Sequence, residues 1–238
     1  MSHQDLHERF FEALLQGDRN EARDIVDGCL MAGITAERVI ERLFWPALET
    51  LQRRFRGDQI STLAHHYAAR LLRMLSDQVQ LRLEMKELNG EKTIVMCGPA
   101  EAEELAGQMI CDLLEAEGFE VYFAGGGVAN DEIIAELGEQ QPRALVVFCS
   151  APSDLPFIRE LIDHIKTIDS CPDAQIAVGG GVFNRAEGLA EEIGADLWAA
   201  TPWELVQEMV ENPDRRAGED QRSVGRRRRQ RDAEVSAA

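Results

Sequence analysis

The sequence contains no long apolar run, no paired-cysteine motif and few aromatic residues. None of its hydrophobic segments approaches the roughly 20 residues that a membrane-spanning helix requires, so we expect a soluble protein that does not enter a membrane. The polar, acidic first residues include no basic leader followed by an apolar stretch, which argues against a secretion signal and favours a cytoplasmic location. Aromatic residues make up only 6% of the 238 residues, but a hydrophobic content of 45% is enough for one or two buried cores.

The five cysteines are spaced singly, without the close pairs that are typical of zinc sites. They are Cys29, Cys97, Cys111, Cys149 and Cys171. Two of them, Cys97 and Cys149, fall at or near the ends of expected strands, where a free cysteine packs as a small apolar residue. We therefore expect buried free thiols rather than disulfides or a zinc site.

Positive charge is concentrated at the C-terminal end of an otherwise acidic chain. The formal net charge is -18, yet the segment from Asp214 onward holds eight arginines against five acidic residues. An acidic body repels nucleic acid, which argues against direct binding of DNA or RNA. We expect residues 213–238, including the run from Arg226 to Arg229, to form a disordered, solvated tail.

The apolar pattern divides the rest of the chain into two domains. Residues 1–88 carry apolar side chains at three- and four-residue spacings, which is typical of amphipathic helices. Residues 92–212 instead alternate short apolar runs with helical patterns, which predicts strands and helices in turn. The pair Asn89-Gly90 is expected to end the helical domain.

Capping residues set the expected helix boundaries in the first domain. Thr35 is placed to cap its third helix, and Pro46 should bend or restart that helix. Ser61 or Thr62 then begins a final helix that runs to about Leu88. With the two earlier helices, this predicts a four-helix bundle.

Five strand segments and five helical segments alternate in the second domain. The expected strands are 93–97, 120–124, 144–150, 175–178 and 197–199. The expected helices are 102–117, 130–140, 154–167, 185–193 and 202–211. Repeated strand–helix units predict an α/β domain with a five-stranded parallel, doubly wound sheet, of the flavodoxin- or Rossmann-like kind, and helices on both faces. Ligands of such sheets bind beyond the carboxyl ends of the strands.

Glycines cluster where these strands are expected to end. The clusters are Gly98, Gly125 to Gly127 and Gly179 to Gly181. Glycine allows close approach of the backbone, either to a ligand or in a tight turn, and both interpretations stay open. The clusters match neither the Gly-x-Gly-x-x-Gly fingerprint nor a Walker loop. No nucleophile motif is evident either, so we expect no enzymatic activity from this chain.

Both domains resemble the cobalamin-binding module of methionine synthase, corrinoid methyl carriers and light-responsive cobalamin-dependent repressors. In the helical domain, the similarity lies in the segment FWPALETLQRRFRGDQISTLAHHYAARLL. The family has a Trp there that is followed, after nine residues, by Glu-His. Phe55 stands at the Trp position, and His65 and His66 follow after nine residues. The resemblance implies a four-helix cap that precedes a cofactor-binding α/β domain.

In the α/β domain, the resemblance rests on the segments VVFCSAPSDLP, IAVGGGVFN and GADLWAATP. By similarity, Ser150 with Gly179 and Gly180 would hold the nucleotide tail of the cofactor. The family's cobalt-ligating loop reads Asp-x-His-x-x-Gly, or Glu-x-His with similar spacing in the repressor branch. Glu101 and Glu103 stand at the aligned positions here. A carboxylate is a poor replacement for imidazole beneath a corrinoid cobalt, so the usual ligation is not expected.

The two adjacent histidines of the helical domain are the remaining candidate ligands. Adjacent helical residues point about 100° apart, so only one of the two histidines can face the expected cofactor site. We expect this residue to be His66, as a ligand to the metal of cobalamin or of another tetrapyrrole such as haem. The alternative is a histidine that is satisfied by hydrogen bonds at the domain interface. Phe55 is expected to pack within the bundle, and the alternative is that its ring forms a platform for the cofactor.

Together these features predict a regulatory or sensor protein that binds cobalamin or another tetrapyrrole and signals through a protein partner. Two alternatives stay open. One is a degenerate module that has lost the cofactor and acts by protein association. The other is a corrinoid carrier for methyl transfer, against which the missing histidine argues, because a carrier must control cobalt ligation.

Overall fold

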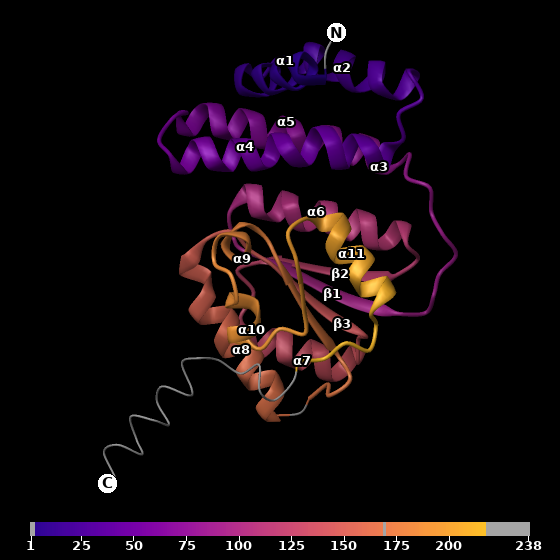
Figure 1. Ribbon diagram of the computed structural model, residues 1–238, viewed down its shortest axis with the longest axis vertical. Coiled ribbons are helices and arrows are strands. Elements are labelled where there is room, and N and C mark those ends of the chain that lie inside the picture. Colours follow the sequence, from indigo (N-terminus) through magenta and orange to yellow (C-terminus); the bar gives the residue numbers. More distant parts are fainter. Residues whose placement is uncertain (1–2, 169, 218–238) are drawn as a thin grey trace. The chain divides into compact units, whose positions relative to one another are not determined.

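The computed structural model describes residues 3–168 and 170–217 (Figure 1). The chain divides into two compact units, one that ends at Glu87 and one that begins at Leu88. In the first unit the described residues form helices only, and the second unit combines strands and helices. Within the described ranges, no helix is both long enough and apolar enough to span a bilayer.

Helices form the first unit, and capping side chains mark where several of them begin. The segments are α1 (His3–Gln16), α2 (Arg19–Met31), α3 (Ala36–Val39), the π-helical η1 (Ile40–Phe44), α4 (Trp45–Arg56) and α5 (Thr62–Gln80). Asp18 caps α2 by accepting hydrogen bonds from the backbone N–H groups of Asn20 and Glu21. Thr35 caps α3 and Ser61 caps α5, as the sequence predicts.

The third predicted helix changes geometry just before Pro46. Segments α3, η1 and α4 follow one another without a break, and η1 is a π-helical stretch of 5 residues. Proline lacks an N–H group, and its ring clashes with the carbonyl four residues earlier in a regular α-helix. The wider π turn makes room for the ring, so the expected bend is a local change of helix type.

The final helix of this unit is shorter than the sequence predicts. Helix α5 ends at Gln80, and not near Leu88. Beyond the helix, the side chains of Leu81, Met85 and Leu88 are 85%, 58% and 78% exposed. The apolar residues of this segment therefore do not form a buried face that would extend the helix.

A parallel five-stranded sheet forms the centre of the second unit. Its strands are β1 (Lys92–Cys97), β2 (Glu120–Gly126), β3 (Ala144–Phe148), β4 (Gln175–Gly179) and β5 (Leu197–Ala199). The order is β2-β1-β3-β4-β5, and every neighbouring pair is parallel. The register between β1 and β2 shifts by one residue: Val95 faces Phe123, whereas Met96 faces Gly125. The strand order reverses between β1 and β3, which makes this the topological switch point.

Helices cover both faces of the sheet (Figure 1). They are α6 (Glu101–Ala116), α7 (Asn130–Gln140), the 3-10 turn η2 (Pro152–Asp154), α8 (Leu155–Ile168), α9 (Gly181–Arg185), α10 (Leu189–Ile193) and α11 (Pro202–Glu211). Helices α6 and α11 lie side by side on one face, and α7 and α8 lie on the other. The single helix expected at 185–193 is wrong: Gly188, with a φ of 78°, separates α9 from α10.

The core of this unit is formed by apolar side chains of the inner strands and of α7 and α8. It includes Leu145, Val147, Ile162 and Val178, each exposed by no more than 1%. All five cysteines of the chain are buried and lie outside any disulfide, which confirms the expected buried thiols.

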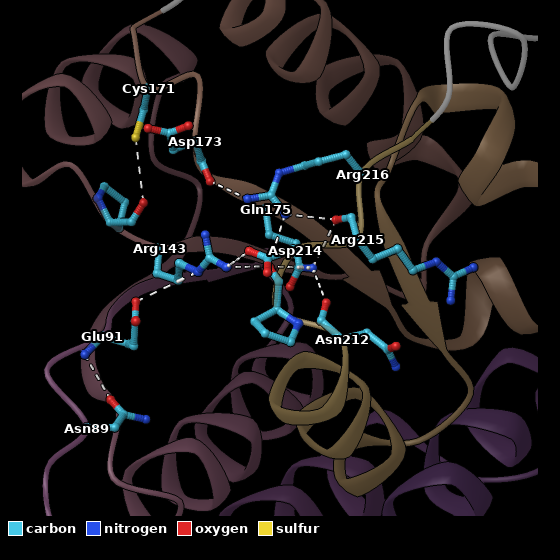
Figure 2. Close-up of polar contacts among 12 residues, drawn as sticks. Asn89, Glu91, Arg143, Cys171, Asp173, Gln175, Asn212, Asp214, Arg215 and Arg216 are labelled. Carbon is cyan, nitrogen blue, oxygen red and sulfur yellow. Dashed lines mark hydrogen bonds and ion pairs between the residues drawn. The ribbon is translucent and has the colours of Figure 1, made fainter.

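The segment that follows α11 is fixed to the amino edge of the sheet (Figure 2). Gln175, at the start of β4, donates from Nε2 to three backbone carbonyls between Asn212 and Arg215, at 2.9, 3.4 and 3.1 Å. Arg143 donates to the carboxylate of Asp214 at 2.7 Å. A buried glutamine thus satisfies its amide by holding a neighbouring piece of backbone.

Asp196 fixes the end of the same segment. Its two carboxylate oxygens accept hydrogen bonds from the backbone N–H groups of Ile176 and Ala217, both at 2.7 Å. Residues 213–217, which the sequence analysis assigned to a disordered tail, are therefore hydrogen-bonded to the α/β unit. The remainder of that expected tail, 218–238, lies outside the described residues.

Candidate functional site

The loops that follow β1, β3 and β4 lie together at the carboxyl edge of the sheet. Two backbone hydrogen bonds join them. The N–H of Gly98 donates to the carbonyl of Phe148 at 3.3 Å, and the N–H of Cys149 donates to the carbonyl of Gly179 at 3.0 Å. Because β1 and β3 flank the switch point, this is the part of the sheet where such folds bind ligands.

Glu103 is a buried carboxylate that joins the first turn of α6 to the loop after β3. The residue is 4% exposed. Its Oε1 accepts a hydrogen bond from the N–H of Ser150 and another, at 3.1 Å, from the N–H of Ala151. Burial raises the pKa of Glu103; the bond from Ser150 opposes this rise, and the nearby carboxylate of Asp154 adds to it.

The second carboxylate oxygen of Glu103 packs against the bare α-carbon of Gly98. A Cβ at Gly98 would collide with Oε2 of Glu103 and would lie 2.8 Å from Oδ2 of Asp154. That oxygen of Asp154 is buried and has no hydrogen-bond partner within the part of the chain that the structure describes. Two carboxylates therefore converge beside Gly98, and only glycine leaves room for them.

Ser150 lies beside the glycines that follow β4. It is 6% exposed, and its hydroxyl oxygen accepts a hydrogen bond from the N–H of Gly181 at 3.3 Å. Arg185, at the end of α9, donates from Nη2 to the carbonyl oxygen of Ser150 at 2.6 Å. The structure thus brings Ser150 together with the glycine cluster, and it adds Arg185, which sequence reasoning placed only at the start of a helix.

Gly179 and Gly180 are required by the packing of the chain itself. A Cβ at Gly179 would lie 2.7 Å from the ring of Phe148, and one at Gly180 would collide with the carbonyl oxygen of Cys149. Gly180 also has a φ of 102°, which favours glycine. At these two positions the geometry supports the tight-turn interpretation.

In the helical unit, Phe55 and His65 form a stacked pair. Their ring centroids lie 4.1 Å apart at an interplanar angle of 26°. His65 is 8% exposed, whereas His66 is half-buried, with its ring centroid 6.0 Å from that of His65. The assignment of His66 as a metal ligand stays a prediction. Among residues 3–168 and 170–217, no group of three or more His, Cys, Asp or Glu side chains is arranged to hold a metal ion.

Comparison with known protein families covers both units. Residues 91–206 match a family described as "B12 binding domain", and residues 6–80 match a second family with the same description. The chain belongs to the B12-binding family. The two matches fall on the α/β unit and on the helical unit, respectively.

Relatives of this B12-binding chain share its two-part organisation. Monomethylamine corrinoid protein 2 of Methanosarcina acetivorans is 20% identical over 212 residues, and monomethylamine corrinoid protein 1 of Methanosarcina mazei is 18% identical over 213. Each match covers 87% of this chain and 97% of the relative. The structure of Methanosarcina barkeri monomethylamine corrinoid protein aligns with a TM-score of 0.76 at 17% identity, over 88% of this chain and 99% of that one. This likeness shows a shared fold, with a helical region followed by the parallel-sheet domain.

In this B12-binding module, the polar groups at the carboxyl edge of the sheet suit the nucleotide tail of a corrinoid but do not suit its cobalt. The hydroxyl of Ser150 accepts from Gly181 and still has a hydrogen to donate, which suits the polar nucleotide tail. Ligation of cobalt from the α/β unit does not fit. Glu103 stands where the resemblance places the histidine, and two backbone N–H groups already hold its Oε1.

Proposed function

We propose that this protein binds a corrinoid and serves as the corrinoid-carrying subunit of a methyl-transfer system, while a partner protein performs the catalysis. The observation that carries this proposal is the combination of both corrinoid-protein units in one chain with the contact of Ser150 and Gly181 at the carboxyl edge. In the sequence alone, the missing histidine favours a sensor. The curated relatives are corrinoid proteins, which favours the carrier.

In the proposed carrier, Glu103 stands where the resemblance places the histidine that binds cobalt. A bound corrinoid supplies the cobalt that accepts and releases a methyl group. The carboxylate of Glu103 is held by the backbone of Ser150 and Ala151, so we propose that the α/β unit offers no ligand to this cobalt. From the helical unit, we propose His66, rather than the more buried His65, as the side chain that contacts the cofactor.

A cofactor-free module that acts through protein association is the second candidate. It is favoured by the convergence of Glu103 and Asp154 on Gly98, because the two side chains fill the space beside the loop after β1, in which the resemblance places the cobalt ligand. In this case the contacts of Glu103 and Asp154 beside Gly98 would only stabilise the fold.

A loading experiment separates the two candidates. The purified protein is incubated with hydroxocobalamin, methylcobalamin or haemin, desalted, and examined by visible spectroscopy. The carrier predicts that corrin bands are retained and that Glu103→Gln leaves their positions unchanged. Glu103→His should shift these bands, because imidazole binds cobalt better than a carboxylate does.

The same experiment also shows which results would contradict the proposed carrier. A folded protein that retains none of the three compounds supports the cofactor-free module. If a corrinoid is retained, methyl transfer is tested by following the loss of the methyl group from protein-bound methylcobalamin when a candidate methyltransferase and the methyl acceptor of that enzyme are added. Retention that is abolished by His66→Ala but not by His65→Ala would support His66 as the contact from the helical unit.

A further inference from the structure

Two carboxylate oxygens from different parts of the carboxyl edge meet beside the bare α-carbon of Gly98. Glu103 lies in the first turn of α6, and Asp154 lies in the 3-10 turn η2 that follows β3. A Cβ at Gly98 would collide with Oε2 of Glu103 and would lie 2.8 Å from Oδ2 of Asp154. The two oxygens are therefore neighbours in a closely packed region, where a proton between them needs no additional space.

The other oxygen of each carboxylate already accepts a hydrogen bond. Oε1 of Glu103 accepts from the N–H groups of Ser150 and Ala151, and Oδ1 of Asp154 accepts from the hydroxyl of Ser153 at 3.3 Å. Oδ2 of Asp154 is buried and has no partner among the residues that the structure describes. Two ionised oxygens that face each other would repel, whereas a proton on one of them supplies a donor to the other.

The charged and titratable side chains around this pair lie on α6 and α9 and at the ends of β1 and β3. They are Glu101, Glu104, Arg185, Cys97 and Cys149. Burial raises the pKa of Cys149, so its thiol stays neutral. Burial also raises the pKa of Glu103; the N–H of Ser150 opposes this rise, and the negative charge of Asp154 adds to it. The guanidinium of Arg185 is exposed and donates to the carbonyl of Ser150. One negative charge on the pair is therefore favoured over two.

We propose that Glu103 and Asp154 share one proton, held between Oε2 and Oδ2, and that this proton joins α6 to η2. One carboxyl then donates to the other carboxylate, so the pair carries a single negative charge. When the proton leaves to water at higher pH, two negative charges face each other beside Gly98, and η2 moves away from α6. The pair is a pH-dependent link between two parts of the candidate site, and it does not require a bound corrinoid.

Infrared spectroscopy of the unliganded protein during a pH titration tests the shared proton. The C=O stretch of a protonated carboxyl differs from that of a carboxylate, so the two forms are measured separately. One protonated carboxyl should persist in the unaltered protein after glutamates with the ordinary pKa of 4.5 have ionised. Difference spectra should show its loss in Glu103→Gln and also in Asp154→Asn, because each amide can donate to the remaining carboxylate and keep it ionised.

Hydrogen exchange of peptides that contain Ser153 and Asp154 tests the movement of η2. After correction for the intrinsic effect of pH, exchange in the unaltered protein should accelerate as the carboxyl band disappears. In Asp154→Asn it should stay constant over the same pH range. Asp163→Asn is the matched control, because it removes an exposed carboxylate from α8. This variant should keep both the carboxyl band and the exchange behaviour of the unaltered protein.

Three results would overturn the inference. A protonated carboxyl that remains in Asp154→Asn would show that Glu103 holds its proton alone. If the unaltered protein shows no protonated carboxyl above the ordinary range, both side chains are ionised, and this result does not depend on the folding of any variant. Loss of the band without a change in exchange would refute the link between α6 and η2. Because all measurements use the unliganded protein, each of these results leaves the proposed corrinoid binding intact.

Discussion

The two edges of the sheet differ in how their polar groups are satisfied. At the amino edge, Gln175 donates to three carbonyls (Figure 2). Asp196 accepts there from two backbone N–H groups. At the carboxyl edge, Asp154 keeps a buried oxygen that has no partner in the described part of the chain, and Arg185 has no carboxylate partner there. Satisfied networks contribute stability, whereas unsatisfied buried groups cost it. The contrast is one of degree, because Thr93 Oγ1 at the start of β1 is also buried without a partner in the described ranges. We propose that the networks of the amino edge support the fold and that the carboxyl edge serves the ligand.

The largest expected effect comes from placing a side chain at a glycine of the carboxyl edge. Gly180→Ala should destabilise the protein by about 3 kcal/mol, because the alanine would need an unfavourable φ and its Cβ would meet the backbone of Cys149. Urea unfolding followed by circular dichroism measures the change.

Gly138→Ala is the control for that substitution. Gly138 lies within α7, and a Cβ there would meet nothing within 4 Å. This variant should gain up to about 1 kcal/mol from helix propensity. If both variants unfold at the same urea concentration, close packing at Gly180 is not what requires glycine.

An intermediate effect is expected at the amino edge. Gln175→Ala should cost about 1 kcal/mol, because it removes the buried side chain that donates to the carbonyls of the segment after α11. Proteolytic cleavage between Asn212 and Arg215 should become faster, while corrinoid binding stays unchanged. Gln207→Ala, which removes only an exposed contact of 2.8 Å to Glu211, should have little effect. A loss of corrinoid binding in Gln175→Ala would contradict the separation of roles between the two edges.

The smallest effect is the pH dependence contributed by Glu103. The pKa of this carboxyl in the folded protein is raised above its ordinary value of 4.5, so the folded state holds the proton more tightly than the unfolded state does. Its stabilising contribution is complete below about pH 4.5 and is lost as the pH rises through the raised pKa. Glu103→Gln cannot titrate. The unaltered protein should therefore lose stability relative to this variant as the pH rises from 4.5 through the raised pKa of Glu103. Parallel pH profiles of the two proteins would show that burial does not perturb Glu103.

The fold was predictable because its signals are local. Each apolar run of the second domain ends at glycine, proline or a polar residue, and the strands found begin and end within two residues of the prediction. The caps at Thr35 and Ser61 follow from the hydroxyl side chains that precede each helix. The end of α5 was missed because the exposed Leu81 and Leu88 look like buried positions in sequence alone.

The candidate site was less predictable because its contacts join residues that lie far apart in the sequence. Glu103 contacts a backbone N–H 47 residues away, and in sequence it is one of three acids in the first turn of α6. Arg185 reaches the carbonyl of Ser150 from 35 residues away, across a helix break that the sequence analysis did not find. The tight turns at Gly179 and Gly180 were recognised as glycine positions, but their close neighbours Phe148 and Cys149 were not.

The one-residue shift between β1 and β2 affects the packing of the loop that follows β1. After the shift, Gly126 lies against the loop that follows β1, where a Cβ would come within 2.6 Å of the α-carbon of Pro99. A side chain at position 126 would therefore displace Gly98 and Pro99, so the position of the loop after β1 depends on a glycine in the neighbouring strand.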